Sequence, residues 1–238
     1  MISLPANKVP RYERKYLINE LQAQKLKFIL DTLCDKDKHL QGRETYNIRS
    51  LYFDDYFRNS YMDNEIGIEP RSKFRIRIYD SQDSFISLEQ KIKIAGKIYK
   101  KRETISKEFF DAVLRGDYEE IEYPNTSPLV NQFLTAHYTK KLEPSVIVDY
   151  DREPYVYPDG DVRITFDRAI AFSNEFEDFF DPEMPLQPIL PLGMQLLEVK
   201  YTEFIPEFIH QQLNNLNLKQ CTFSKYYLCE KYKRMGEF

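Results

Sequence analysis

The sequence predicts an α+β fold in which eight antiparallel strands close into a β-barrel and helices pack on its outside. Three observations favour this fold. Short runs alternate apolar with charged residues, aromatic residues are abundant (18 Tyr and 17 Phe), and the 238 residues include only seven glycines. Alternation puts the charged side chains of a strand on one face, and closure removes exposed sheet edges. Helices on the apolar face would leave the charged face to line an interior tunnel.

The expected strands are runs of alternating or apolar residues separated by polar turns. They cover residues 8–18, 46–54, 73–78, 87–94, 98–105, 145–152, 162–167 and 195–201. Turns are expected at 80–84, 95–97 and 159–160, where Asp, Ser and Gly gather. We expect a surface loop over the acidic and proline-rich residues 173–193.

The expected helices carry apolar residues on one side and begin at capping residues. They cover residues 20–34, 107–116, 127–139, 206–216 and 224–234. Asn19 and Ser106 are candidate N-caps, Gly116 marks a helix end, and Pro206 suits a first turn. The sequence shows no internal repeat or domain boundary, so residues 1–238 are expected to form one domain.

Composition excludes several classes of protein. The chain has no stretch of about 18 apolar residues, so no membrane-spanning helix is expected, and it begins without an apolar leader segment. Its three cysteines show no CxxC spacing and its three histidines lie far apart. A disulfide framework and a Cys/His zinc site are therefore not expected, and a cytoplasmic location is the default expectation.

Positive charge is concentrated in one segment. Residues 71–102 contain ten basic and three acidic side chains, although the whole chain has a net charge of −4. For a single strand, a solvated face is the commoner explanation of such charges. Neighbouring strands that repeat the same sign would repel each other, so the pattern favours a polyanionic ligand that supplies the counter-charge. The spacing of Arg75 and Arg77, about 6.5–7 Å along a strand, suits successive phosphoryl groups.

A few acids share the cationic faces: Glu13, Glu89, Asp167 and Glu198. A carboxylate beside a phosphate chain is repelled unless a divalent cation lies between them, and Mg²⁺ or Mn²⁺ typically takes one or two carboxylates together with phosphate oxygens. The alternative for each acid is an ion pair with a neighbouring Lys or Arg.

Six short motifs occur in order along nearly the whole chain: Arg11-Tyr12-Glu13-Arg14-Lys15-Tyr16, Arg49-Ser50-Leu51-Tyr52-Phe53-Asp54, Arg75-Ile76-Arg77-Ile78-Tyr79, Leu88-Glu89-Gln90-Lys91, Leu197-Glu198-Val199-Lys200-Tyr201 and Ser224-Lys225-Tyr226. Together they resemble the VTC domain, the polyphosphate polymerase branch of the triphosphate tunnel metalloenzymes. The resemblance implies a tunnel barrel of the CYTH type that binds ATP or inorganic polyphosphate with Mn²⁺ or Mg²⁺. It also implies that Glu198 holds metal and that Lys225 contacts phosphate.

The resulting hypothesis is metal-dependent phosphoryl transfer from ATP to a phosphate chain. The residues expected to carry catalysis are Lys15, Arg75, Arg77, Glu198 and Lys200. The residues expected to bind phosphate are Lys15, Arg49, Arg75, Arg77, Lys91, Lys100, Arg102, Arg152, Arg163, Lys200 and Lys225. The expected metal ligands are Glu198, Glu13 and Asp167. An acceptor that is itself a phosphate oxyanion demands no general base, which agrees with the scattered histidines.

Two alternatives stay open: a hydrolase of triphosphates that uses a metal-bound water, and a non-catalytic polyphosphate-binding module. The wider superfamily begins with Glu-x-Glu-x-Lys, whereas this chain has Arg11 at the first position, which favours the polymerase branch. Nucleic-acid binding is not expected, because a tunnel of this size would be too narrow for a duplex. The many Tyr and Phe residues are expected to pack helices on the barrel exterior.

Overall fold

The computed structural model describes residues 11–117 and 127–236, and within these ranges ten strands form one antiparallel sheet. The strands are β1 (Tyr12–Asn19), β2 (Asp35–Lys36), β3 (Tyr46–Asp54), β4 (Arg71–Tyr79), β5 (Gln82–Ile94), β6 (Lys97–Ile105), β7 (Glu143–Tyr157), β8 (Val162–Ser173), β9 (Gln187–Pro188) and β10 (Met194–Tyr201). The helices are α1 (Glu20–Leu33), α2 (Asn59–Glu65), α3 (Lys107–Arg115), α4 (Pro128–Lys140), α5 (Glu207–Asn215) and α6 (Lys225–Gly236), with 3₁₀ turns η1 (Lys38–Leu40) and η2 (Phe176–Asp178).

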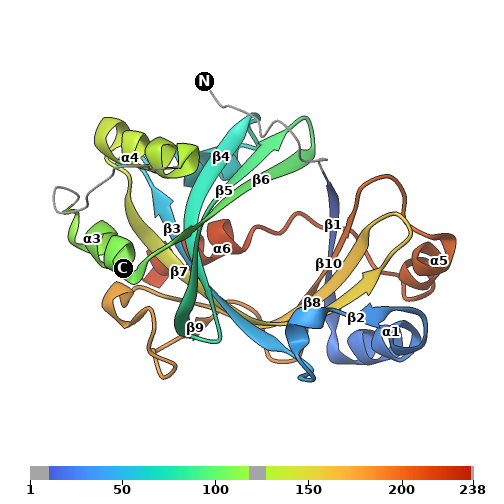
Figure 1. Ribbon diagram of the computed structural model, residues 1–238. Helices are drawn as coiled ribbons and strands as arrows, with labels where there is room; N and C mark the ends of the chain where they lie inside the picture. The colour runs from blue at the N-terminus through green and yellow to red at the C-terminus, as the bar shows by residue number, and fades with distance from the viewer. Residues whose placement is uncertain (1–10, 118–126, 237–238) are drawn as a thin grey trace.

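Eight strands follow one another in the order β1-β10-β8-β7-β3-β4-β5-β6, and the sheet curls until its two ends approach each other (Figure 1). There Arg11 and Ile98 form one antiparallel bridge with two N–H···O bonds of 3.3 Å. In the part of the chain that the structure describes, no β1–β6 ladder continues from this bridge. The predicted closed eight-stranded barrel is therefore wrong in its closure and in its strand number. Closure depends on strand tilt and stagger, which an alternating pattern does not specify.

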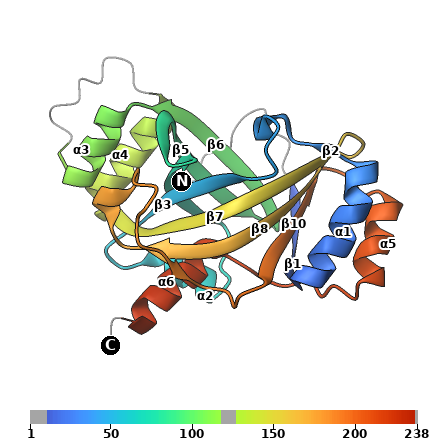
Figure 2. The same cartoon turned by 90° about the horizontal axis from the view of Figure 1, so that it is seen from below.

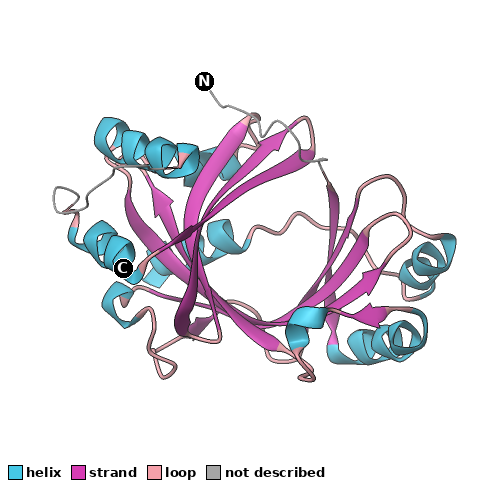
Figure 3. Ribbon diagram, viewed as in Figure 1, coloured by secondary structure: helices cyan, strands magenta, loops and turns pink. Residues whose placement is uncertain are grey.

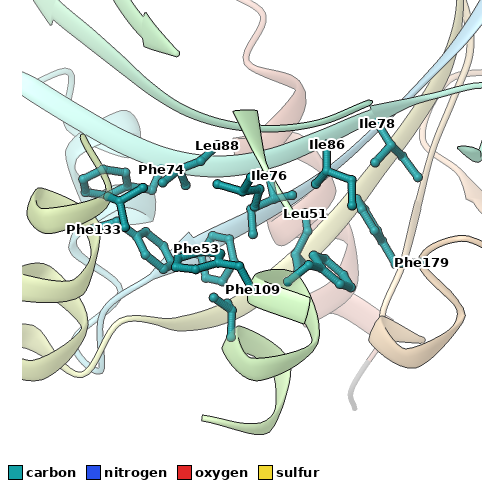
Figure 4. Close-up of a cluster of buried hydrophobic side chains, with 14 of the residues drawn as sticks. Leu51, Phe53, Phe74, Ile76, Ile78, Ile86, Leu88, Phe109, Phe133 and Phe179 are labelled. Atoms are coloured by element: carbon teal, nitrogen blue, oxygen red, sulfur yellow. The ribbon is translucent and has the colours of Figure 1, made fainter. Parts of the chain in front are cut away.

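Alternation along the strands decides which face is apolar. In β4, Phe74, Ile76 and Ile78 point outward and are buried against α3 and α4, where Phe133 is fully buried (Figure 4). The Ser106 hydroxyl accepts a hydrogen bond from the backbone N–H of Phe109, so it caps α3 as predicted. The sheet and the helices outside it are seen most directly in Figure 3.

The opposite stretch of the outer face is covered by α1 and α5, which lie side by side in both views (Figures 1 and 2). Leu26 and Leu30 of α1 pack there with Ile209 and Leu213 of α5. Asn19 forms a capping box at the start of α1: its side chain accepts from the N–H of Gln22 at 2.9 Å. The predicted cap is therefore confirmed. Apolar packing holds two helix pairs, α3 with α4 and α1 with α5, against the outer face of the sheet.

The C-terminal helix α6 lies across one end of the curled sheet, within the outline of the strands in Figure 1 and below them in Figure 2. Its Tyr226 ring packs on Tyr52 of β3 with centroids 5.1 Å apart, and Cys229 is fully buried. Because α6 begins at Lys225, this packing brings a lysine to the concave side of the sheet.

Most expected elements are present, with shifted ends. The strand expected over 8–18 is β1, although residues 8–10 lie outside the described residues. The expected strands at 145–152 and 162–167 are longer, and α2 falls where no helix was predicted. The loop expected over 173–193 contains η2 and β9, which pairs with β8. None of the described helices is both long enough and apolar enough to cross a membrane.

Candidate functional site

The concave face of the sheet gathers the charged side chains, and we call this set the charged face. It contains Glu13 and Lys15 of β1, Lys73, Arg75 and Arg77 of β4, Glu89 and Lys91 of β5, Lys100 of β6, Arg152 of β7, Arg163 and Asp167 of β8, Glu198 and Lys200 of β10, and Lys225 of α6. The register supports the grouping, because Lys15 pairs with Glu198, Lys200 with Arg163 and Arg152 with Asp167. The same alternation that buries the apolar residues outside thus orders these charges inside the curl.

Glu198 lies where several cations converge. Its carboxylate is 2.7 Å from Nζ of Lys200, 3.0 Å from Nζ of Lys225 and 3.3 Å from Nζ of Lys15. Burial alone would raise its pKa, but these ammonium groups hold the pKa of Glu198 well below its ordinary value. Glu198 is therefore an anion surrounded by lysines from β1, β10 and α6.

Asp167 is the second buried acid of the charged face and is fully buried. Arg152 binds it with two hydrogen bonds of 2.6 Å, and Nζ of Lys225 lies 2.5 Å from Oδ2. Burial acts to raise the pKa of Asp167, but Arg152 and Lys225 bring it below its ordinary value. Lys225 consequently bridges Asp167 and Glu198.

Glu13 links strands that are remote along the order of the sheet. Its carboxylate lies 3.0 Å from Nζ of Lys15 and 3.3 Å from Nζ of Lys91, which belongs to β5. Burial opposes ionisation here too, yet Lys15 and Lys91 hold the pKa of Glu13 far below its ordinary value. The pair between Glu13 and Lys91 shows that the curl brings β1 and β5 within side-chain reach.

Glu89 neutralises part of the β4 row. Arg75 contacts its carboxylate through NH2 at 2.6 Å and donates from NH1 to the Tyr52 hydroxyl at 2.8 Å. Lys100 forms an ion pair with the same carboxylate. Burial lowers the pKa of Lys100 to about 7, against the opposing effect of Glu89.

Two cations of the charged face form no ion pair among the described residues, although Glu89 attracts Arg77 from beyond contact distance. Arg77 is 5% exposed, and its hydrogen bonds go to the hydroxyls of Ser50 and Tyr150. Lys73 lies 4.6 Å from the ring of Tyr226 and takes part in no ion pair. Burial, with the repulsion of Lys91 and other cations, holds the pKa of Lys73 well below its ordinary value. A desolvated positive charge is costly without a counter-charge, so this part of the face is suited to an anion.

Solvent reaches the charged face through its outer members. The side chains of Lys91, Arg163 and Lys100 are 32%, 31% and 39% exposed, whereas those of Arg152 and Lys225 are 8% exposed. Arg163 contacts Asp37 at 2.6 Å. The charged face therefore has a buried centre at Asp167 and Glu198, and the outer cations around that centre are accessible to solvent.

Most of the predicted phosphate-binding residues are brought together here, but Arg49 is not. In β3 it pairs with Ile78, so it lies on the outer face, away from Arg75 and Arg77. Its Nε contacts Asp149 at 2.7 Å, and NH1 donates to the backbone carbonyls of Phe179 and Asp181. Arg49 thus ties β3 to β7 and to the loop after β8. Arg102 pairs with Glu89 and so lies on the concave side, where it is exposed and stacks on Phe85.

The sequence-based site omitted three contributors. Lys73 continues the alternation of Arg75 and Arg77, so the signal for it was present. Tyr52 and Tyr150 supply hydroxyls to Arg75 and Arg77, and a tyrosine on a strand carries no sequence signal that separates this role from packing.

The carboxylates suit a divalent metal in donor chemistry. Glu13, Asp167 and Glu198 offer only oxygen atoms, the preferred ligands of Mg²⁺ and Mn²⁺. In the described residues, however, no three acidic, His or Cys side chains converge as a metal cluster. Lys15 bridges Glu13 and Glu198, and Lys225 bridges Glu198 and Asp167. The acids thus form the ion pairs that were the alternative to metal ligation. One or two carboxylates would complete a metal site only together with phosphate oxygens.

Comparison with known proteins gives the family of the chain. The family model described as the VTC domain matches residues 10–232. This chain belongs to the VTC domain family. No curated protein sequence matches the chain significantly.

Solved structures share the fold of this VTC domain at low sequence identity. A candidate adenylate cyclase from Bacillus halodurans is 15% identical, with a TM-score of 0.52 over 90% of this chain and 95% of that one. The PH1819 protein of Pyrococcus horikoshii OT3 is 14% identical, with a TM-score of 0.50 over 94% of this chain and 99% of that one. At such identities the likeness concerns the fold alone.

Proposed function

We propose that this VTC domain binds a linear phosphate chain on its charged face and transfers a phosphoryl group from ATP to the end of that chain. The observation behind this proposal is that Arg77, which is buried, and Lys73, which is half-buried, both lie on the concave side and form no ion pair within the described residues. A phosphate chain supplies the missing negative charge. Membership of the VTC family supports the same ligand class.

The row on β4 can follow a phosphate chain by contacting phosphoryl groups that are not directly adjacent. Lys73, Arg75 and Arg77 occupy alternate positions, which are about 6.5–7 Å apart along a strand. Guanidinium groups bind phosphate oxygens bidentately. Arg152, Lys200 and Lys225 approach from the opposite side of the curl and are held there by Glu198 and Asp167.

Transfer to a phosphate acceptor requires positioning and charge neutralisation rather than a covalent nucleophile. The cations of the charged face align the donor and acceptor chains and stabilise negative charge on the transferring group. Lys15 and Lys225 each contact two carboxylates. Lys200, Lys91 and Arg152 pair with the same acids. If phosphate oxygens attract all of these cations, Glu198, Glu13 and Asp167 would be left to hold Mn²⁺ or Mg²⁺. A bound divalent ion would neutralise phosphate charge and orient the oxygens.

The residue type at position 11 supports transfer over hydrolysis, because an arginine supplies no carboxylate for a second metal or for activation of a water molecule. Its guanidinium instead contacts Asp161 at 2.5 Å, with the two side chains 43% and 51% exposed.

The test is incubation of the purified protein with ATP and Mn²⁺ or Mg²⁺, with products separated by gel electrophoresis. We expect phosphate chains longer than three units, and we expect Glu198→Gln to abolish them. Glu44→Gln, a substitution at an exposed acid, is the matched control. Release of orthophosphate from tripolyphosphate without chain growth would favour a hydrolase. Binding without turnover in either assay would favour a non-catalytic module.

A further inference from the structure

The cationic row on β4 ends in an aromatic pair. Tyr79 follows Arg77 at the next position on the concave side, and its ring centroid lies 6.2 Å from that of Phe85 on β5. The guanidinium of Arg102 lies 5.6 Å from the centroid of Phe85. Tyr79 and Phe85 are partly exposed and Arg102 is exposed.

These rings do not belong to the helix packing outside the sheet, where the sequence placed the aromatic residues. On β5, Ile86 and Leu88 point to the outer apolar cluster, so Phe85 lies on the other face. Tyr79 packs edge-on against Tyr46, with centroids 5.8 Å apart. The pair is therefore supported from one side and reachable by solvent, next to cations that suit phosphates.

We propose that Tyr79, Phe85 and Arg102 bind the base of a nucleoside triphosphate whose phosphates lie along Arg77 and Arg75. This inference rests on the proposed function and locates the part of the same site that would hold the phosphoryl donor, the nucleoside triphosphate. The step from Arg77 to Tyr79 is about 6.5–7 Å along the strand, a distance that one sugar spans between phosphate and base. Aromatic rings and an Arg plane are the surfaces on which bases stack.

Stacking uses the π-face that every base has. The site therefore distinguishes nucleoside triphosphates from inorganic phosphate chains, and it accepts purine and pyrimidine triphosphates alike. An inorganic chain has no group that fits the aromatic pair, so it binds through the cations of the charged face alone.

The test measures dissociation constants for ATP, GTP, UTP and tripolyphosphate by calorimetry at fixed Mg²⁺ and salt. We expect Phe85→Leu to raise the dissociation constant of each nucleoside triphosphate by about five- to 100-fold. The dissociation constant of tripolyphosphate should change by less than about twofold. Phe28→Leu, at a ring that is 79% exposed on α1, is the matched control and should change neither ligand class. As a second measurement on the unaltered protein, the fluorescence of 1,N6-etheno-ATP should be quenched on binding.

The outcomes separate this inference from the function on which it rests. If Phe85→Leu weakened the binding of ATP and tripolyphosphate equally, or if bound etheno-ATP were not quenched, base stacking would be overturned and the proposed function would still stand. Failure of the unaltered protein to bind tripolyphosphate would overturn the proposed function, and the base site with it.

Discussion

Nζ of Lys225, the first residue of α6, lies 3.0 Å from Oε1 of Glu198 on β10. The helix that supplies this lysine is fixed to β3 and β7, which are not neighbours of β10 in the order of the sheet. The Tyr226 hydroxyl donates to Oδ2 of Asp54 at 2.5 Å, and Ser145 donates to Glu230 at 2.9 Å. The position of the ammonium group beside Glu198 therefore depends on how α6 docks against β3 and β7.

Tyr226→Phe tests that docking. The variant keeps the ring that packs on Tyr52 and removes the hydroxyl that Asp54 binds. Hydrogen bonds to charged groups contribute about 1.5–3 kcal/mol, so urea denaturation should show a free energy of unfolding lower by about that amount. Tyr232→Phe alters an α6 ring that is 45% exposed, and its free energy of unfolding should stay within about 0.5 kcal/mol of that of the unaltered protein. Equal effects of the two substitutions would contradict the anchoring role of the Tyr226 hydroxyl.

Glu198→Gln should separate phosphate binding from the effect of metal. Without metal, loss of the carboxylate frees Lys200 and Lys225 and removes a repulsive charge, so tripolyphosphate should bind more tightly, by roughly threefold to tenfold. With Mn²⁺ present, the unaltered protein should gain affinity and the variant should gain little. Calorimetry with and without Mn²⁺ measures both effects. A metal-dependent gain of the same size in both proteins would show that Glu198 is not a ligand.

Alternation along β4 and β5 was sufficient to predict the charged face, because one face of each strand is apolar and the other is charged. It failed for Arg49, since β3 is buried on both faces and its pattern does not reveal which side an arginine takes. The helix α2 was missed because none of its residues is buried. It is held instead by Asp54, which accepts from the N–H groups of Ser60 and Tyr61.

The ion pairs of the site could not be predicted from local sequence either. Lys91 and Glu13 are 78 positions apart, and Lys225 and Asp167 are 58 apart. Their contacts follow from the curl of the sheet and from the docking of α6. An alternating pattern specifies neither the degree of curl nor the distance across the concave side.

Lys100→Arg should reduce the pH dependence of phosphate binding. Burial lowers the pKa of Lys100 to about 7, so the amine loses its positive charge as the pH rises through neutrality, whereas Arg stays charged. Affinity of the unaltered protein for tripolyphosphate should fall between about pH 6 and pH 8.5 by up to about fivefold more than that of the variant. Titration of the phosphate itself is common to both proteins. Parallel pH profiles would show that Lys100 does not titrate in this range or does not contact the anion.

Arg77 and Arg49 are both buried, at 5% and 2% exposed, but their partners differ in kind. Arg49 contacts the carboxylate of Asp149 and two backbone carbonyls. Arg77 contacts two neutral hydroxyls, is repelled by Arg75 and is attracted by Glu89 without an ion pair. Breaking a buried ion pair typically costs about 3–5 kcal/mol, whereas removing a buried charge without an acidic partner also removes a desolvation penalty.

Substitution by methionine should therefore affect stability at position 49 and ligand binding at position 77. Arg49→Met should lower the free energy of unfolding by about 3–5 kcal/mol. Arg77→Met should change it by less than about 1 kcal/mol or raise it, while weakening tripolyphosphate roughly 10- to 150-fold through loss of a charge-assisted contact. Urea denaturation and calorimetry on both variants give the comparison. Arg77 would be a structural residue if Arg77→Met destabilised the fold as much as Arg49→Met and left tripolyphosphate affinity unchanged. That result would contradict the proposal that the β4 row binds phosphate.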